Sequence, residues 1–288
     1  MAALVAVATL LSLEAYARIG YHAPGEMAAR ARAAAAEMRA DTVDVSLYGT
    51  CLGEQTLDTR LLGGVLGEGG RVHNLSSTGS GPLDWYLAQS NLMDPAKLDA
   101  IVILYVMGDL YRAPSPWQSQ AMELARWSDV PDIARWSCTT RACQAEFYLR
   151  RASYFYRYRA YFGNWAWWMA GARSLSRDPP EGKPPGGGRS AAEEAALHYL
   201  GRLVTQSHAE GIPVLFLPMP LSPRSGQARS GDQARIEGWL QGLGGRILPA
   251  PKLDRGDYED DVHLNGRGKA NFTFAAGELI KQVLAELR

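Results

Sequence analysis

Short apolar runs alternate with longer amphipathic segments along two parts of the chain, 41–109 and 190–288. One run, 100–106, is apolar throughout, which is typical of a strand buried on both faces. Strands separated by helices predict a parallel sheet covered on both sides, that is, a three-layer α/β/α fold. The runs that predict strands are 44–48, 71–75, 100–106, 213–217 and 246–248.

The segments between these runs carry helix signals. We expect one helix over 54–65, one starting near Pro82, and one over 190–210 with Ser190 as its cap. Over 266–288, apolar side chains recur every three or four residues and form one stripe of a last helix. They are Phe272, Ala276, Leu279, Ile280, Val283 and Leu287.

Residues 110–189 interrupt this alternation and predict a large aromatic-rich insertion in the α/β domain. Between 147 and 177 lie eleven aromatic residues and six arginines, without an acidic residue. A linker rich in proline and glycine, 178–188, follows. Four interpretations of the aromatic stretch stay open: a lid over a substrate cleft, a membrane-surface element, a wall that stacks on sugars, or a small separate core.

The N-terminal run 1–13 is apolar or small and ends before Glu14 and Arg18. It is shorter than the roughly 20 residues that span a bilayer, and it has neither a basic start nor a clean cleavage site. We interpret 1–20 as a membrane anchor or signal segment, with a buried N-terminal helix as the alternative. The alanine-rich residues 21–40 predict a helical spacer, which leaves 41–288 as the α/β domain with its insertion.

Composition excludes several classes of protein. Hydrophobic residues make up 47% of the chain, which is enough for a sizeable core and too much for general disorder. The 30 lysines and arginines balance the 30 aspartates and glutamates, so we expect no nucleic-acid partner. The sequence contains no P-loop, no HExxH zinc motif and no GxSxG hydrolase motif. We therefore expect neither a cofactor nor a metal.

Candidate chemistry lies just after the predicted strands, because ligands of doubly wound sheets bind beyond the carboxyl ends of the strands. The first strand runs into residues 49–51, the second into the small-residue loop 74–82, and the third into residues 108–109. A fourth polar segment, 260–265, precedes the last helix.

Three residues of these segments suit nucleophilic catalysis. Asp260 and His263 are spaced so that the carboxylate reaches Nδ1 of the imidazole, which fixes the tautomer that a general base needs. Cys51 follows a glycine at a strand end, where a histidine or a helix N-terminus activates a thiol. The structural alternatives are a loop or helix-capping histidine and a buried, inert cysteine.

The remaining cysteines and histidines suit structural roles. Cys138 and Cys143 lie five residues apart and, outside the cytoplasm, would form a local disulfide that leaves the remaining cysteine unpaired. His73 lies within a strand, and we interpret it as structural. His198 and His208 share a predicted helix without a third metal ligand nearby, which favours surface or packing roles.

In their order along the chain, these segments resemble the blocks of the SGNH (GDSL-type) hydrolase family, especially its membrane-anchored bacterial members. The first block, Gly-Asp-Ser in the family, reads Gly-Thr-Cys at 49–51. The second block carries an oxyanion glycine, and residues 74–82, NLSSTGSGP, resemble it with Gly79 in that position.

The later blocks extend the resemblance. The third, an Asn-Asp pair in the family, reads Gly-Asp at 108–109. The fifth, Asp-x-x-His followed by Leu-Asn, matches fully over 260–265. The resemblance covers 41–109 and 190–288 and leaves the aromatic insertion unexplained.

Three positions depart from the family pattern. Cys51 replaces the nucleophilic serine, Gly108 replaces the oxyanion asparagine, and Thr50 takes the place of the aspartate. A thiolate is the better nucleophile at neutral pH, whereas a lost oxyanion donor typically costs about 10²–10³ in turnover.

The resemblance implies a flavodoxin-like sheet of about five parallel strands and an esterase or O-acyltransferase with a Cys51–His263–Asp260 triad. The amides of Cys51 and Gly79 would bind the oxyanion. The implied substrates are acyl or acetyl esters of cell-envelope polysaccharide or lipid. The implied location is the bacterial cell envelope, with the chain anchored to the membrane and the domain outside the cytoplasm. The alternative is a catalytically degenerate binding protein that works with other proteins in envelope polysaccharide modification or export.

Overall fold

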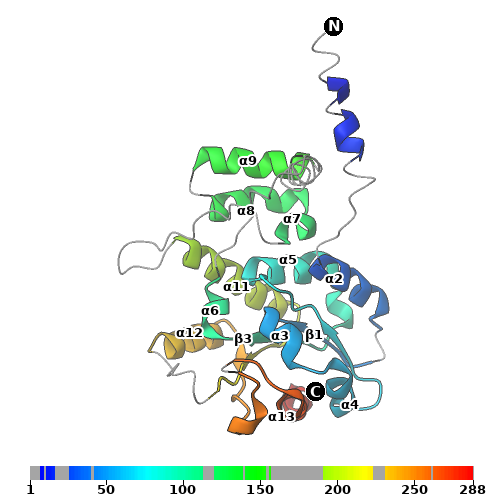
Figure 1. Cartoon of the computed structure of the whole chain (residues 1–288), viewed down its shortest axis with the longest axis vertical. Helices are drawn as coiled ribbons and strands as arrows, with labels where there is room; N and C mark the ends of the chain where they lie inside the picture. The colour runs from blue at the N-terminus through cyan, green and yellow to red at the C-terminus, as the bar shows by residue number, and fades with distance from the viewer. Residues whose placement is uncertain are drawn as a thin grey trace, which may run out of the picture. The chain divides into compact units, whose positions relative to one another are not determined.

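The chain folds into two compact units, an α/β unit of residues 25–125 and 191–288 and a helical unit of residues 1–24 and 126–190 (Figure 1). The computed structural model describes residues 7–9, 11–16, 26–39, 42–112, 120–138, 140–153, 156, 191–222, 231–260 and 262–287.

The α/β unit contains one five-stranded sheet in which every neighbouring pair is parallel. Its order, β2-β1-β3-β4-β5, is that of flavodoxin-like sheets. The five predicted strands are therefore confirmed, with ends that shift by at most one residue. The strands are β1 (Asp44–Tyr48), β2 (Arg71–Asn74), β3 (Ala100–Tyr105), β4 (Val214–Pro218) and β5 (Arg246–Ile247).

Helices cover both faces of this sheet and complete the predicted three layers. On one face, alternate side chains such as Leu47 and Val102 pack against α4 (Thr59–Leu66) and α13 (Gly266–Leu287). On the other face, the Tyr48 hydroxyl donates to Gln89 of α5 (Pro82–Leu92). The α11 helix (Ala191–Ala209) packs against α5 and β4, and α12 (Gly231–Gly242) packs against β5.

The segment after β1 differs from the single helix predicted over 54–65. Two helices form there, α3 (Cys51–Thr56) and α4, because the chain is extended at Leu57 and Asp58. The Asp58 carboxylate accepts hydrogen bonds from the amides of Arg60 and Leu61 and so caps α4. The break lets α3 start directly at Cys51. The predicted cap Ser190 lies outside the described residues.

Two further helices at the predicted boundaries belong to the α/β unit. The α2 helix (Glu26–Glu37), predicted as a spacer, packs against α5 and β2 and buries Met27, Ala28 and Ala31 completely. The α7 helix (Ala121–Leu124), which falls within the predicted insertion, also packs against α5. The segment that leaves the α/β unit is thus 126–190 rather than 110–189.

The helical unit contains η2 (Trp127–Asp129), α8 (Val130–Ser137) and α9 (Arg141–Ala152), together with the helical residues 7–9 and 11–16. The Ser153 hydroxyl donates to the Glu14 carboxylate at 2.8 Å, which joins the N-terminal residues to the end of α9. Of the aromatic stretch, the structure describes only Phe147, which is fully buried, Tyr148, which is exposed, and Tyr156. The other aromatic residues of 147–177 lie outside the described residues.

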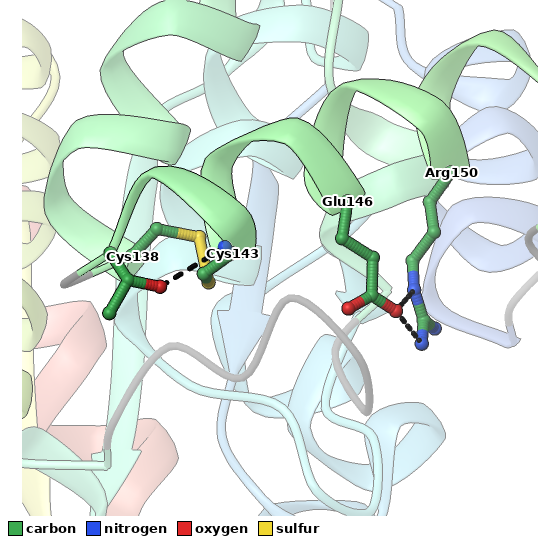
Figure 2. The surroundings of a disulfide bond; sticks show 5 residues. Cys138, Cys143, Glu146 and Arg150 are labelled. Carbon is green, nitrogen blue, oxygen red and sulfur yellow. Dashed lines mark hydrogen bonds and ion pairs between the residues drawn. A yellow bond between two sulfur atoms is a disulfide. The ribbon is translucent and has the colours of Figure 1, made fainter.

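The predicted disulfide between Cys138 and Cys143 is confirmed (Figure 2). Its Cα atoms lie 5.4 Å apart, and it joins the end of α8 to the first turn of α9. The Thr140 hydroxyl caps α9 by accepting from the amide of Cys143. Cys51 is left as a free thiol. Among the described residues, no helix has both the length and the apolar character to cross a bilayer.

Candidate active site

The carboxyl end of β1 presents Cys51 as the first residue of α3, partly exposed to solvent. An amide at this helical position has no intrahelical acceptor. The preceding residue, Thr50, does not cap the helix with its side chain. Among the described residues, no group accepts a hydrogen bond from the Cys51 amide.

The Thr50 hydroxyl instead donates to the buried carboxylate of Asp109, at 3.2 Å. Asp109 lies in α6 (Met107–Leu110), directly after β3, and also accepts from the amide of Val106. Burial raises the pKa of Asp109, although the hydrogen bonds from Val106 and Thr50 and the charge of Arg112 act in the opposite direction. This contact joins the ends of β1 and β3, which are neighbours in the sheet.

Gly79, the predicted oxyanion residue, occupies a tight turn after β2. The amide of Ser80 donates to the carbonyl of Ser77 at 3.0 Å, and Gly79 has a φ of +80° at the third position of that turn. A positive φ at this position is typical of a type II turn and favours glycine. The Gly79 amide has no acceptor among the described residues, so it is available to a ligand.

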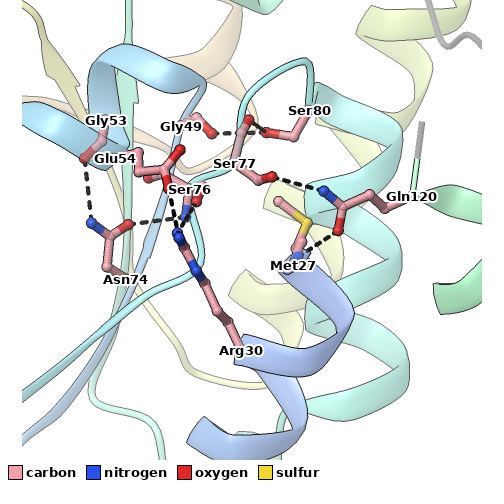
Figure 3. Close-up of polar contacts among 10 residues, drawn as sticks. All are labelled: Met27, Arg30, Gly49, Gly53, Glu54, Asn74, Ser76, Ser77, Ser80 and Gln120. Atoms are coloured by element: carbon pink, nitrogen blue, oxygen red, sulfur yellow. Dashed lines mark hydrogen bonds and ion pairs between the residues drawn. The ribbon is translucent and has the colours of Figure 1, made fainter. Parts of the chain in front are cut away.

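The loop that carries Gly79 is tied to the end of β1 through the carbonyl of Gly49. That carbonyl accepts from the amide of Ser77 at 3.2 Å and from the Ser80 hydroxyl at 2.8 Å (Figure 3). The Ser80 hydroxyl in turn accepts from the indole of the buried Trp85. The loop and the residues before Cys51 are therefore held together by direct hydrogen bonds.

Asp260 and His263 form the predicted pair. The Asp260 carboxylate lies 2.8 Å from Nδ1 of the imidazole and also accepts from the amides of Val262 and His263. These backbone hydrogen bonds, above all that from Val262, lower the pKa of Asp260 to about 2, and the imidazole acts in the same direction. A carboxylate at Nδ1 requires the proton there, which leaves Nε2 of the neutral ring as an acceptor.

The loop of His263 is braced from both sides. An isolated bridge joins Tyr258 to Leu264, and the Glu259 amide donates to the carbonyl of His263. The side chain of Asn265 then accepts from the amide of Gly268 in the first turn of α13. Both Asp260 and His263 are exposed, so their pair faces solvent.

The structure brings some of these residues into contact and leaves others apart. Hydrogen bonds link Gly49 and Thr50 to the Gly79 loop and to Asp109. Leu52 and Leu264, which follow Cys51 and His263, pack against the same apolar cluster under α4 and α13. No hydrogen bond joins the Cys51 thiol to the imidazole in the described part of the chain.

Gly108, which the SGNH resemblance aligns with an asparagine, is exposed in the short α6 helix. A Cβ atom built there meets no other atom within 4 Å, so the backbone leaves room for a side chain. An asparagine at position 108 would therefore fit without a clash at its Cβ atom.

Two polar side chains that the sequence analysis did not single out contact this region. Arg30 of α2 binds both Ser76 and Glu54, and Gln120 donates to the Ser77 hydroxyl. Their partners lie between 24 and 46 residues away along the chain, so no local motif identifies them.

Three other histidines, His73, His198 and His208, have the structural surroundings predicted for them. His73 is buried, with Nε2 2.6 Å from the Asp44 carboxylate. His198 and His208 lie on α11, where His198 contacts the ring of Tyr199 and His208 lies close to Gly244. Among the described residues, no group of three or more metal-ligating side chains is clustered.

Comparison with known proteins identifies no family model that matches the chain and no curated protein that is similar to it.

Proposed function

We propose that the protein is a cysteine-dependent ester hydrolase or O-acyltransferase with a triad of Cys51, His263 and Asp260. The observation that supports this proposal most strongly is the 2.8 Å contact between the Asp260 carboxylate and Nδ1 of His263. This contact leaves Nε2 of His263 as a proton acceptor. Separately, the free cysteine Cys51 begins α3 after β1. Catalytic hydrogen bonds are often long in unliganded enzymes and tighten when substrate binds.

The first half of the reaction forms a thioester. His263 takes the proton of the Cys51 thiol, and the sulfur attacks the carbonyl carbon of the ester. The negative charge that develops on the carbonyl oxygen is stabilised by the amides of Cys51 and Gly79. When the tetrahedral intermediate collapses, the C–O bond breaks and the imidazolium returns the proton to the leaving alcohol.

The second half regenerates the thiol. Water, or the hydroxyl of an acceptor, gives its proton to His263 and attacks the thioester carbonyl. The C–S bond breaks, and the proton passes back to the Cys51 sulfur. Water yields a carboxylic acid, whereas an acceptor hydroxyl yields a new ester, so one set of residues supports hydrolysis and transfer.

The substrate and location follow from the SGNH resemblance. We propose acyl or acetyl esters of cell-envelope polysaccharide or lipid as substrates, with the protein attached to the membrane by its N-terminal segment and the α/β unit outside the cytoplasm. The Cys138–Cys143 disulfide supports an oxidising location, because structural disulfides are rare in the cytosol of most organisms.

A second candidate function is that of a catalytically degenerate binding or assembly protein for envelope polysaccharide. The observation in its favour is Gly108, because the position that donates a side-chain amide in the family carries no side chain. On this view the Gly79 loop and the carboxyl ends of the strands bind an ester or a sugar and catalyse no reaction of it.

A hydrolysis assay separates these functions. Purified full-length protein is given p-nitrophenyl acetate and an acetylated polysaccharide, beside C51A, H263A and the control H208A, an exposed histidine of α11. We expect activity in the wild type and in H208A, and a loss of about 10³-fold or more in the other two. A folded wild type without activity, or equal activity in all four proteins, would contradict the triad.

A further inference from the structure

The α2 helix lies outside the segments that resemble the hydrolase family, yet one of its side chains reaches the proposed active site. Nη1 of Arg30 donates to the carbonyl oxygen of Ser76 at 2.6 Å, and Nη2 lies 2.5 Å from Oε1 of Glu54 (Figure 3). Ser76 belongs to the loop that carries Gly79, and Glu54 belongs to α3. One guanidinium group therefore bridges two separate segments of the site.

Both anchor points lie close to the proposed reactive groups. Glu54 is three residues after Cys51 in the same helix, which places the two about one turn apart. Ser76 is three residues before Gly79 in the loop. The planar guanidinium group of an arginine carries several donors in fixed directions and so suits two acceptors at a fixed separation. A lysine ammonium on its flexible stem cannot bind both acceptors in this way.

The two segments also pack closely beneath Arg30. A Cβ atom built on Gly53 would lie 2.7 Å from the hydroxyl of Ser76, and one on Gly49 would lie 3.2 Å from it. The side chain of Asn74 accepts from the amide of Ser76 and donates to the carbonyl of Gly53. A small movement of either segment therefore changes the spacing of both.

A second contact ties the loop to α2. The Gln120 side-chain amide donates to the Ser77 hydroxyl at 2.7 Å, and its carbonyl oxygen accepts from the amide of Met27 at 2.5 Å (Figure 3). The amino-terminal half of α2 and the Gly79 loop are thus linked twice, through Arg30 and through Gln120.

We propose that Arg30 is a positioning residue of the active site. Through Glu54 and Ser76 it sets the distance between the Cys51 thiol and the Gly79 amide, so that one acyl carbonyl meets both. The inference rests on the proposed function and adds to it a residue of α2 that sets the geometry of the site. Arg30 acts through other residues and contacts no reacting atom, so its loss slows the chemical step and leaves ground-state binding largely intact. A misplacement of about 1 Å can cost roughly 10²-fold in rate.

The kinetic test compares R30Q and R30K with R32Q, which removes an exposed arginine from the same helix. For R30Q we expect kcat for p-nitrophenyl acetate to fall by about 10-fold to 10²-fold, with KM within about twofold of the wild type. R30K should recover part of the loss, because it keeps the charge but not the fork. R32Q should match the wild type.

Hydrogen exchange of the full-length protein gives a readout that does not need activity. In R30Q, the amides of 51–56 and 75–81 should exchange about tenfold faster than in R32Q, while those of β1 and β3 are unchanged. If R30Q does not fold, E54Q serves instead, because it removes the charge of the α3 partner and leaves the contact with Ser76.

The outcomes separate the two proposals. If the wild type hydrolyses no ester, the proposed function fails and exchange alone decides the role of Arg30. Faster exchange in both segments then supports the bridge, and exchange equal to that of R32Q overturns it. In an active wild type, an unchanged kcat in R30Q, or an effect on KM alone, overturns the positioning role even where exchange is faster.

Discussion

The two ends of β1 carry opposite kinds of polar chemistry. At the amino end, Asp44 is completely buried, and its carboxylate is bonded to Thr42, His73 and Arg71. At the carboxyl end, Cys51 has a free thiol, and its amide has no acceptor among the described residues. The amino end of the strand uses its carboxylate within the fold, whereas the carboxyl end leaves the thiol and the amide of Cys51 available.

Two buried aspartates, Asp44 in β1 and Asp109 after β3, show the same contrast in their pKa values. Burial acts to raise the pKa of Asp44, but hydrogen bonds from Thr42 and His73 and the charge of Arg71 outweigh it and lower the value. Burial raises the pKa of Asp109, because its hydrogen bonds and the charge of Arg112 do not compensate. The paired charge of Asp44 stabilises the fold, whereas the carboxylate of Asp109 is buried with less compensation for its charge.

The largest effect is expected from Asp44→Ala. It removes the partner of a buried histidine and of Arg71, so we expect the free energy of unfolding to fall by about 3–5 kcal/mol, measured by urea titration. Lys97→Ala removes an exposed pair with Asp94 and should cost about 1 kcal/mol or less. Equal losses of unfolding free energy in both variants would show that the buried ion pairs of Asp44 contribute no more than an exposed pair.

The next effect is a gain of activity in Gly108→Asn. Space is open at Gly108, and under the proposed function an asparagine there would supply an oxyanion donor, so kcat should rise by about 10²-fold to 10³-fold, or roughly 2.7–4 kcal/mol. Gly238→Asn, on α12, also adds a side chain where space is open and should leave kcat unchanged. A folded Gly108→Asn with the turnover of the wild type would show that this position does not face the oxyanion.

A smaller effect is expected from Asp109→Asn, measured as stability against pH. An amide keeps an acceptor for Thr50 and Val106 without a buried charge, so at pH 7 the variant should be more stable by about 1 kcal/mol or less. A raised pKa in the folded protein means that the wild type gains relative stability in acid. The advantage of the variant should therefore disappear below about pH 4, and an advantage that grows in acid would contradict this assignment.

The smallest effect concerns Asp260, whose pKa is lowered from 3.8 to about 2. A lowered pKa contributes stability that is complete above the unfolded value and is lost as the pH falls through the folded value. Between about pH 2 and pH 4, the unfolding free energy of the wild type should therefore fall more steeply with decreasing pH than that of Asp260→Asn. The difference in slope should correspond to the uptake of up to about one proton on unfolding. Identical slopes in urea titrations across this range would show that the hydrogen bonds of Asp260 with Val262 and His263 do not persist in solution.

The sequence was sufficient to predict the sheet and the order of the candidate residues, since both depend on short-range patterns. Apolar runs predict β1 to β5, and the spacing of Asp260 and His263 predicts their contact. The break between α3 and α4 carried a local signal as well, because Asp58 stands where an N-cap residue is favoured.

The contacts of α2 could not be predicted in this way. Arg30 and Glu54 are 24 residues apart, and Arg30 and Ser76 are 46 residues apart, so only the folded chain shows that one side chain binds both. The alanine-rich composition of α2 indicates a helix but not the surface on which it packs. The cluster around Asp44 is similar, because β2 supplies His73 and Arg71 through strand pairing.

The Cys138–Cys143 bridge has a practical consequence for work with the Cys51 thiol. A dithiol added to keep the Cys51 thiol from oxidising can also reduce the bridge between α8 and α9. Storage under dithiothreitol would thus protect the α/β unit and at the same time remove the disulfide of the helical unit. Mass spectrometry of alkylated peptides, counting one modified cysteine or three, shows which form of the protein has been assayed.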